Sequence, residues 1–136
     1  MSIVIDASVA ASWIFQAQAT DATERLKASS DRFIAPHLFL YEVRNVIAVQ
    51  RRRDRLSIVE AEDALSRLGA LEISVLPAPD EADCDHIFRL ALAEGLNFYD
   101  AVYLDLALSD GASIATRDSS LAAAAARRVI QVLDCR

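Results

Sequence analysis

The chain alternates short apolar runs with longer stretches in which apolar positions recur at helical spacing. The short runs, rich in Ile and Val, predict strands at residues 2–5, 32–35, 73–76, 113–116 and 129–133. The longer stretches predict helices near residues 7–15, 19–29, 37–53, 57–70, 80–94, 98–109 and 119–127. Continuous apolar runs suit strands buried on both faces, as in a parallel sheet. The alternation therefore predicts an α/β fold, a three-layer α/β/α sandwich with a mostly parallel central sheet.

Signals at the ends of several helices support these boundaries. Ser57 and Glu60 have the spacing of a capping box, in which each side chain accepts a hydrogen bond from the other residue's amide. Asp80 is placed to open the helix near 80–94, and Gly95 to close it in the left-handed conformation that glycine adopts readily. Gly111 is expected to end the following helix in the same way.

The composition is that of one ordinary globular domain spanning residues 1–136. Apolar residues make up 54% of the chain, and the two cysteines, Cys84 and Cys135, are too few for a disulfide framework or a zinc site. The apolar start is interrupted by Asp6 and lacks a basic segment, which argues against a signal peptide. No run approaches the roughly 18 apolar residues of a membrane span, so we expect a cytoplasmic protein that makes no contact with a membrane.

Four acidic residues stand where apolar residues are expected. Asp6 and Asp118 each follow a predicted strand, whereas Glu42 and Asp100 lie within predicted helices that are apolar around most of their circumference. An ionised carboxylate in such surroundings costs several kcal/mol unless it is paired or binds a metal. Ligands of open parallel sheets bind beyond the carboxyl ends of the strands, which is where both aspartates fall.

If these acids share one pocket, they need a compensating charge, and the chain has a single lysine, Lys27, that is not near any of them in sequence. A hard divalent cation supplies that charge, and oxygen ligands favour Mg²⁺ or Mn²⁺ over zinc. Each acid also has a structural interpretation. Asp6 and Asp118 can cap helices, Asp100 can be a first-turn acid after Asn97, and Glu42 can pair with an arginine.

Together these residues resemble the PIN-domain nucleases, and within them the VapC-type toxins of bacterial toxin–antitoxin pairs. The resemblance rests on residues 3–8 (Ile-Val-Ile-Asp-Ala-Ser), Glu42 with Asn45, residues 99–101 (Tyr-Asp-Ala) and residues 116–118 (Thr-Arg-Asp), and it covers essentially the whole chain. It implies an acidic pocket that holds Mg²⁺ or Mn²⁺ and hydrolyses RNA, in the toxin of a type II pair. It also implies a homodimer and a cognate antitoxin protein as partners.

The resemblance also assigns roles to residues. The family's four acidic positions fall on Asp6, Glu42, Asp100 and Asp118. Metal binding and catalysis are implied for all four, with Glu42 either a ligand or the group that orients the attacking water. The polar positions that support these carboxylates fall on Ser8, Asn45 and Thr116. Some members carry a further acid where this chain has Ser120, so the number of metal ions, one or two, stays open.

The net charge of −6 argues against binding nucleic acid over a broad surface, but the local distribution differs. Within residues 44–55 a single acid, Asp54, is opposed by Arg44, Arg51, Arg52, Arg53 and Arg55. Arginine suits phosphate because its planar fork binds two oxygens. The same arginines would also complement the dipole at a helix C-terminus, so both interpretations stand.

Three other classes compete with a nuclease. A phosphoacceptor receiver domain would need an acidic pair near the first strand and a lysine near the last, and neither is present. A haloacid-dehalogenase-type phosphatase would carry Asp-x-Asp after the first strand, where this chain has Ser8. The sequence does not reject a catalytically silent interaction module with the PIN fold, although the four acids weigh against it.

Overall fold

The computed structural model describes the whole chain, Met1–Arg136, and its strands form a single parallel sheet in the order β3-β2-β1-β4-β5. The strands are β1 Ser2–Ile5, β2 Arg32–Ala35, β3 Ile73–Val75, β4 Ser113–Thr116 and β5 Val132–Asp134. All pairings are parallel, so the carboxyl ends of the five strands meet at one edge of the sheet. The predicted α/β sandwich with a parallel sheet is confirmed.

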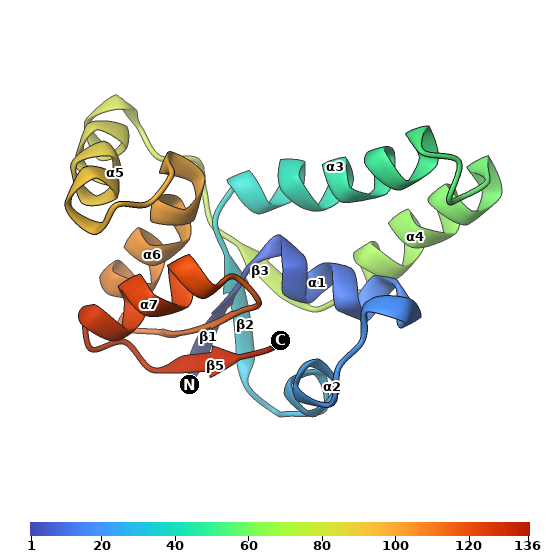
Figure 1. Ribbon diagram of the computed structural model, residues 1–136, viewed down its shortest axis with the longest axis horizontal. Coiled ribbons are helices and arrows are strands. Elements are labelled where there is room, and N and C mark those ends of the chain that lie inside the picture. Colours follow the sequence, from blue (N-terminus) through green and yellow to red (C-terminus); the bar gives the residue numbers. More distant parts are fainter.

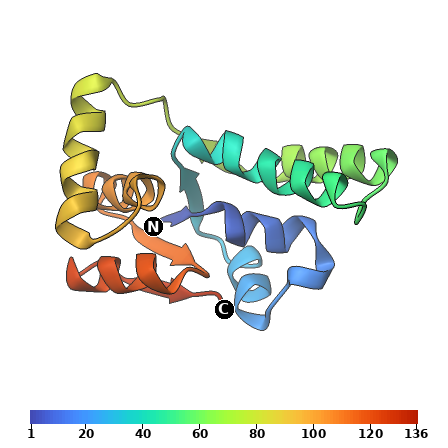
Figure 2. The same cartoon turned by 45° about the horizontal axis from the view of Figure 1, so that its top comes forward.

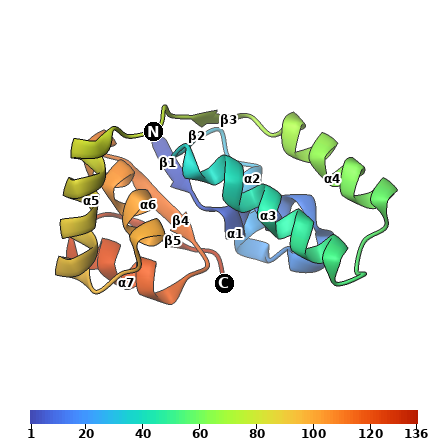
Figure 3. The ribbon, with the colours of Figure 1, turned by 90° about the horizontal axis from the view of Figure 1, so that it is seen from above.

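The helices cover the sheet from two sides. They are α1 Ala7–Ile14, α2 Asp21–Lys27, α3 Leu38–Arg52, α4 Ile58–Ala70, α5 Glu81–Glu94, α6 Phe98–Asp110 and α7 Ser119–Arg127, with a short 3-10 helix η1 at Gln16–Gln18. Helices α1–α4 gather on one side of the strands and α5–α7 on the other (Figure 1). The view from above shows the same separation, with α3 and α4 extending away from α6 and α7 (Figure 3). No helix is long and apolar enough to cross a membrane.

The helix ends follow the local chemistry expected of them. Ser57 and Glu60 form the reciprocal capping box at the start of α4, and the Asp80 side chain accepts from the Asp83 amide at the start of α5. Gly95 and Gly111 close α5 and α6 with φ of 65° and 62°, the left-handed region. Gly95 thus ends α5 shortly before Asn97 caps α6, the helix that carries Asp100.

The central strands β1 and β4 bring two distant segments together. Their register pairs Ile5 with Ala115, so Asp6 and Thr116 are the next residues of each strand at the carboxyl edge. The chain builds the sheet outward in one direction through β2 and β3 and in the other through β4 and β5, so the order reverses between β1 and β4. That reversal is the position at which open α/β sheets bind their ligands.

One predicted strand was wrong at its start. The apolar run at 129–133 predicts a strand, whereas β5 spans Val132–Asp134. Val129 instead has φ of 60° and closes α7. Its amide donates to the carbonyl of Ala126, and the Ile130 amide donates to the carbonyl of Ala125, the pattern of a Schellman motif. Residues whose apolar character predicts a strand therefore form the end of the helix instead.

Candidate active site

A pocket of ≈ 350 Å³ opens at the carboxyl edge of β1 and β4. Its lining comprises Asp6, Ala7, Ser8, Glu42, Asp100, Tyr103, Arg117 and Asp118. The four acids singled out from the sequence all lie in this lining. They arrive there from four separate places in the chain, after β1, on α3, on α6 and after β4.

Asp6 is the one charged residue among the buried residues, with 7% of its surface exposed. Its Oδ1 accepts from the Ser8 hydroxyl at 2.5 Å and from the Val9 amide at 3.1 Å, and its Oδ2 accepts from the Thr116 hydroxyl. Burial raises the pKa of this carboxyl, and the hydrogen bonds oppose that rise. The three donors hold the side chain in one orientation at the floor of the pocket.

Thr116 links the two aspartates that follow the central strands. Its hydroxyl donates to Asp6 and accepts from the backbone amide of Asp118 at 2.9 Å. Asp118 in turn caps α7, because its Oδ1 accepts from the amides of Ser120 at 2.7 Å and Leu121 at 3.1 Å. One hydroxyl therefore connects the buried carboxylate of Asp6 to the backbone of the more exposed Asp118.

Glu42 projects from α3 and meets Tyr103 of α6. The Tyr103 hydroxyl donates to Glu42 Oε1 at 2.7 Å. Burial raises the pKa of Glu42, and the negative charge of Asp6 raises it further, whereas the hydrogen bond from Tyr103 lowers it. This contact joins the helices on the two sides of the sheet across the pocket.

The pKa of Asp100 shows the effect of the neighbouring acids most clearly. Its pKa is raised to about 6, first by burial and then by the negative charges of Asp118, Asp6 and Glu42. Asn97 caps α6 by accepting from the Asp100 amide at 2.8 Å, and its side-chain amide donates to Asp100 Oδ2 at 3.2 Å. Asp100 is thus close enough to the other three carboxylates to be affected by their negative charge.

None of the four acids makes an ion pair with an arginine or lysine. The pairing of Glu42 with an arginine, expected as one interpretation, is therefore absent, and Tyr103 takes its place. The helix-cap interpretation holds for Asp6 and Asp118, and the Asp100 amide is part of the cap at Asn97. Capping uses one carboxylate oxygen of Asp118 and leaves the other free, so it does not compete with a role in the pocket.

The other sequence-derived residues divide into two groups. Ser8 and Thr116 both contact Asp6, as the resemblance implies for residues that support the carboxylates. Asn45 is exposed on α3, makes no side-chain hydrogen bond and does not line the pocket, so its supporting role stays a prediction. Arg51, Arg52 and Arg53 end α3 at its connection to α4, on the far side of the molecule from α6 and α7 (Figure 2).

Arg44 and Arg55 are exposed as well and stand outside the pocket. Arg44 donates to the carbonyl of Leu40, and Arg51 donates to Asp54 and to the carbonyl of Leu56. None of the five arginines of this cluster lines the acidic pocket. Their contact with RNA stays a prediction.

The donor set of the pocket fits a hydrated divalent cation. Four carboxylates supply only oxygen, which is the preference of Mg²⁺ and Mn²⁺. No three acidic, histidine or cysteine side chains converge closely enough to enclose an ion by themselves. Mg²⁺ keeps several of its waters and is usually held through one or two carboxylates together with substrate phosphates, so a closed cage is not required.

Two polar residues of the lining were missed by sequence reasoning. Tyr103 lies in an apolar run that favours a core position, and it is a core residue with a polar tip. Its spacing of three from Asp100 places both on one helix face, which was the available signal. Arg117 lies between Thr116 and Asp118 in the sequence, and its direction depends on a contact with Gln18 that no local pattern encodes.

Comparison with known proteins identifies the family. The model of the family described as PIN domain matches residues 3–127. The chain therefore belongs to the PIN-domain family.

Individual relatives are similar to this chain over most of its length. Over 123 residues it is 31% identical to a protein named Ribonuclease VapC3 from Pyrobaculum aerophilum, covering 90% of this chain and 93% of that protein. The crystal structure of PAE2754 from the same organism superposes with a TM-score of 0.69 at 28% identity, over 91% of this chain and 84% of that one. VapBC2 from Rickettsia felis, solved bound to a promoter DNA fragment, gives 0.65 at 13% identity over 98% of each chain, a likeness of fold alone.

Proposed function

We propose that this protein is a metal-dependent endoribonuclease, the toxin of a type II toxin–antitoxin pair, that hydrolyses RNA phosphodiester bonds with an activated water. One observation carries the proposal. Four carboxylates from four distant segments line one pocket at the point where the strand order reverses, without any ion pair to neutralise them. A fold gains no stability from such repulsion, so the arrangement is best explained by a cation that binds there.

The chain's own residues would divide the work as follows. Asp6, Asp100 and Asp118 are assigned to hold the hydrated cation, through its waters where they do not bind it directly, and Glu42 either joins them or orients the attacking water. Ser8, Thr116 and the Val9 amide fix the Asp6 carboxylate, and Tyr103 fixes that of Glu42. A bound Mg²⁺ or Mn²⁺ would lower the pKa of a water and offset charge on the phosphodiester. No protein nucleophile is required.

The experiment is cleavage of a circular single-stranded RNA and of its linear form by the purified chain. We expect both to be cut with Mg²⁺ or Mn²⁺ and neither with chelator, since only an endonuclease opens a circle. Asp6→Asn and Asp100→Asn should abolish the activity, because each removes a carboxylate but keeps the side-chain volume. Cutting that persists in chelator, or in both variants, would contradict the proposal.

Failure of the metal-loaded protein to cut any RNA would favour the alternative, a catalytically silent interaction module with the PIN fold. The partners are proposed on family grounds: a cognate antitoxin protein and a second copy of the chain. Light scattering coupled to size exclusion at micromolar concentration tests the homodimer, and only monomers would refute it. Co-expression with a candidate antitoxin tests that partner, which should suppress RNA cleavage.

A further inference from the structure

Arg117 is the one positively charged side chain in the lining of the acidic pocket. It follows Thr116 at the end of β4 and precedes Asp118, so its backbone stands between the two aspartates that follow the central strands. In such surroundings an arginine is expected to pair with a carboxylate. Arg117 makes no ion pair.

A contact to a distant main-chain group explains why. Nη1 of Arg117 donates to the carbonyl of Gln18 at 2.8 Å, 99 residues away in η1. This hydrogen bond holds the guanidinium toward η1, at one side of the pocket. A guanidinium has five N–H donors, and only one of them has a protein partner here.

An oriented arginine with free N–H donors beside an acidic pocket is suited to bind a phosphate group. The carboxylates attract a cation, and RNA brings phosphates whose negative charge they repel, so an anion-binding group is needed near the same pocket. Arginine binds phosphate oxygens in pairs through its planar fork, and an anchored head loses little freedom on binding. The exposed arginines of residues 44–55 do not line the pocket and do not meet this need.

We infer that Arg117 is a phosphate-binding residue: its free N–H groups bind the RNA backbone beside the acidic pocket, while the Gln18 carbonyl keeps the guanidinium away from the carboxylates. The inference rests on the proposed function and deepens it, because it names how a pocket of negative charge accepts a polyanion. The contact reads the backbone, so it acts on every RNA sequence alike.

Binding without cleavage tests this. In an Asp100→Asn background, a labelled single-stranded RNA is titrated by fluorescence anisotropy at several salt concentrations. Adding Arg117→Gln should weaken binding about tenfold, the loss of one charge-assisted hydrogen-bonded contact. The slope of log K against log salt should flatten by about 0.7, the value for one phosphate contact on a single strand. Arg117→Lys should restore the slope but not the full affinity.

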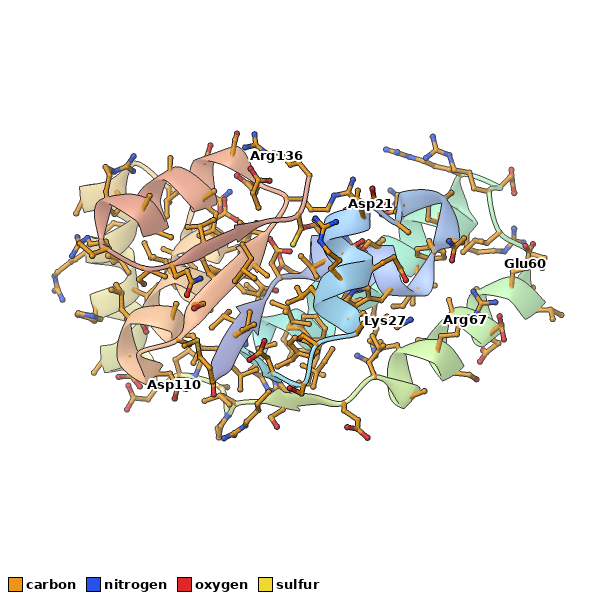
Figure 4. The ribbon with its side chains drawn as sticks, turned by 90° about the horizontal axis from the view of Figure 1, so that it is seen from below. Asp21, Lys27, Glu60, Arg67, Asp110 and Arg136 are labelled. Carbon is orange, nitrogen blue, oxygen red and sulfur yellow. The ribbon has the colours of Figure 1, made fainter.

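Arg67→Gln is the matched control. Arg67 also donates through Nη1 to a distant carbonyl, that of Ile14 at 3.0 Å, but it lies on α4 on the opposite side of the molecule from α6 and α7 (Figure 4). It should change neither affinity nor slope. Equal losses in the two variants, or an unchanged slope in Arg117→Gln while wild type cleaves RNA, would overturn the inference alone. A wild-type chain that neither binds nor cleaves RNA would overturn the proposed function and this inference together.

Discussion

The Tyr103 hydroxyl donates a 2.7 Å hydrogen bond to Glu42 across 61 residues of sequence, and it ties α6 to α3 over the acidic pocket. Tyr103 itself is 2% exposed, so its ring is part of the core while its oxygen reaches the site. Tyr103→Phe keeps the ring and leaves the half-buried Glu42 carboxylate without its donor. We expect the free energy of unfolding to fall by about 1–3 kcal/mol and RNA cleavage to slow. The control is Tyr41→Phe, at an exposed tyrosine on the same α3. It should leave both the free energy of unfolding, measured by urea titration, and the rate of RNA cleavage unchanged.

The repulsion at Asp100 predicts an unusual dependence of stability on pH. Its folded pKa of about 6 lies above the ordinary value of 3.8, so the folded state binds this proton more tightly than the unfolded chain. The resulting stabilisation is complete below the ordinary value and is lost as pH rises through about 6. The melting temperature of the metal-free protein should therefore decrease between pH 5 and 7, in the usual scan by calorimetry.

Asp100→Asn removes this titration. At pH 7 it should stabilise the metal-free protein by about 1 kcal/mol, after allowance for solvent screening of a half-exposed group, while it abolishes cleavage. Asp110→Asn, at the far end of the same helix (Figure 4), is the control and should preserve the difference between the two pH values. The account would be contradicted if raising the pH from 5 to 7 stabilised the wild-type protein more than it stabilised Asp100→Asn.

A divalent cation should reverse the repulsion. Mg²⁺ or Mn²⁺ at a hundred times its dissociation constant raises the free energy of unfolding by about 2.7 kcal/mol, if it binds the folded chain alone. Differential scanning fluorimetry should show a rise in melting temperature with wild type and a much smaller one with Asp6→Asn. Wild type that melts at the same temperature with and without millimolar Mn²⁺ would argue against a cation site.

Thr116 makes a prediction about the spacing of the two aspartates. Thr116→Val is isosteric but removes the donor to Asp6 and the acceptor of the Asp118 amide. Thr116 and Asp6 are both buried, and we expect a loss of about 2–3 kcal/mol in urea unfolding. Thr116→Ser keeps the hydroxyl and should lose less than half as much. Equal losses in the two variants would show that the methyl group, rather than the hydroxyl, carries the effect.

Val129 is a place where the chain can be stabilised. It is 94% exposed and adopts φ of 60°, a conformation that costs a residue with a Cβ about 1–2 kcal/mol. Val129→Gly should raise the free energy of unfolding by up to about 1 kcal/mol, because almost no packing is lost there and glycine's greater freedom in the unfolded chain offsets part of the gain. The same change at Val59, exposed within α4, should instead destabilise by about 0.5–1 kcal/mol in the same denaturant titration.

Much of this fold is predictable from sequence because local chemistry and tertiary structure agree. The strands at 2–5, 32–35 and 113–116 come out as expected, since their apolar runs end at residues that begin a helix or a turn. The pairing of β1 with β4, which brings Asp6 and Thr116 to the same edge of the sheet, depends on long-range packing that these local signals do not encode. The run beginning at Val129 fails because apolar character does not reveal a left-handed backbone at the end of α7.

Much of the candidate site is also predictable from the sequence. Charges placed in apolar segments mark Asp6, Glu42 and Asp100, and the pocket includes them all. Tyr103 escapes notice because a tyrosine in a buried helix resembles any other core residue until its hydroxyl has a partner. Arg117 escapes because its orientation is set by Gln18, whose position depends on how α1 and η1 pack.

The helix caps at Asp6 and Asp118 have a practical consequence for the design of an inactive variant. Each carboxylate accepts backbone amides at the start of a helix, so alanine there would remove an amide acceptor and a pocket acid at once. Cells that survive expression of such a variant would not distinguish an intact, inert chain from one that failed to fold and was degraded. Asparagine, which still accepts the amide hydrogen bonds, gives the cleaner inactive form.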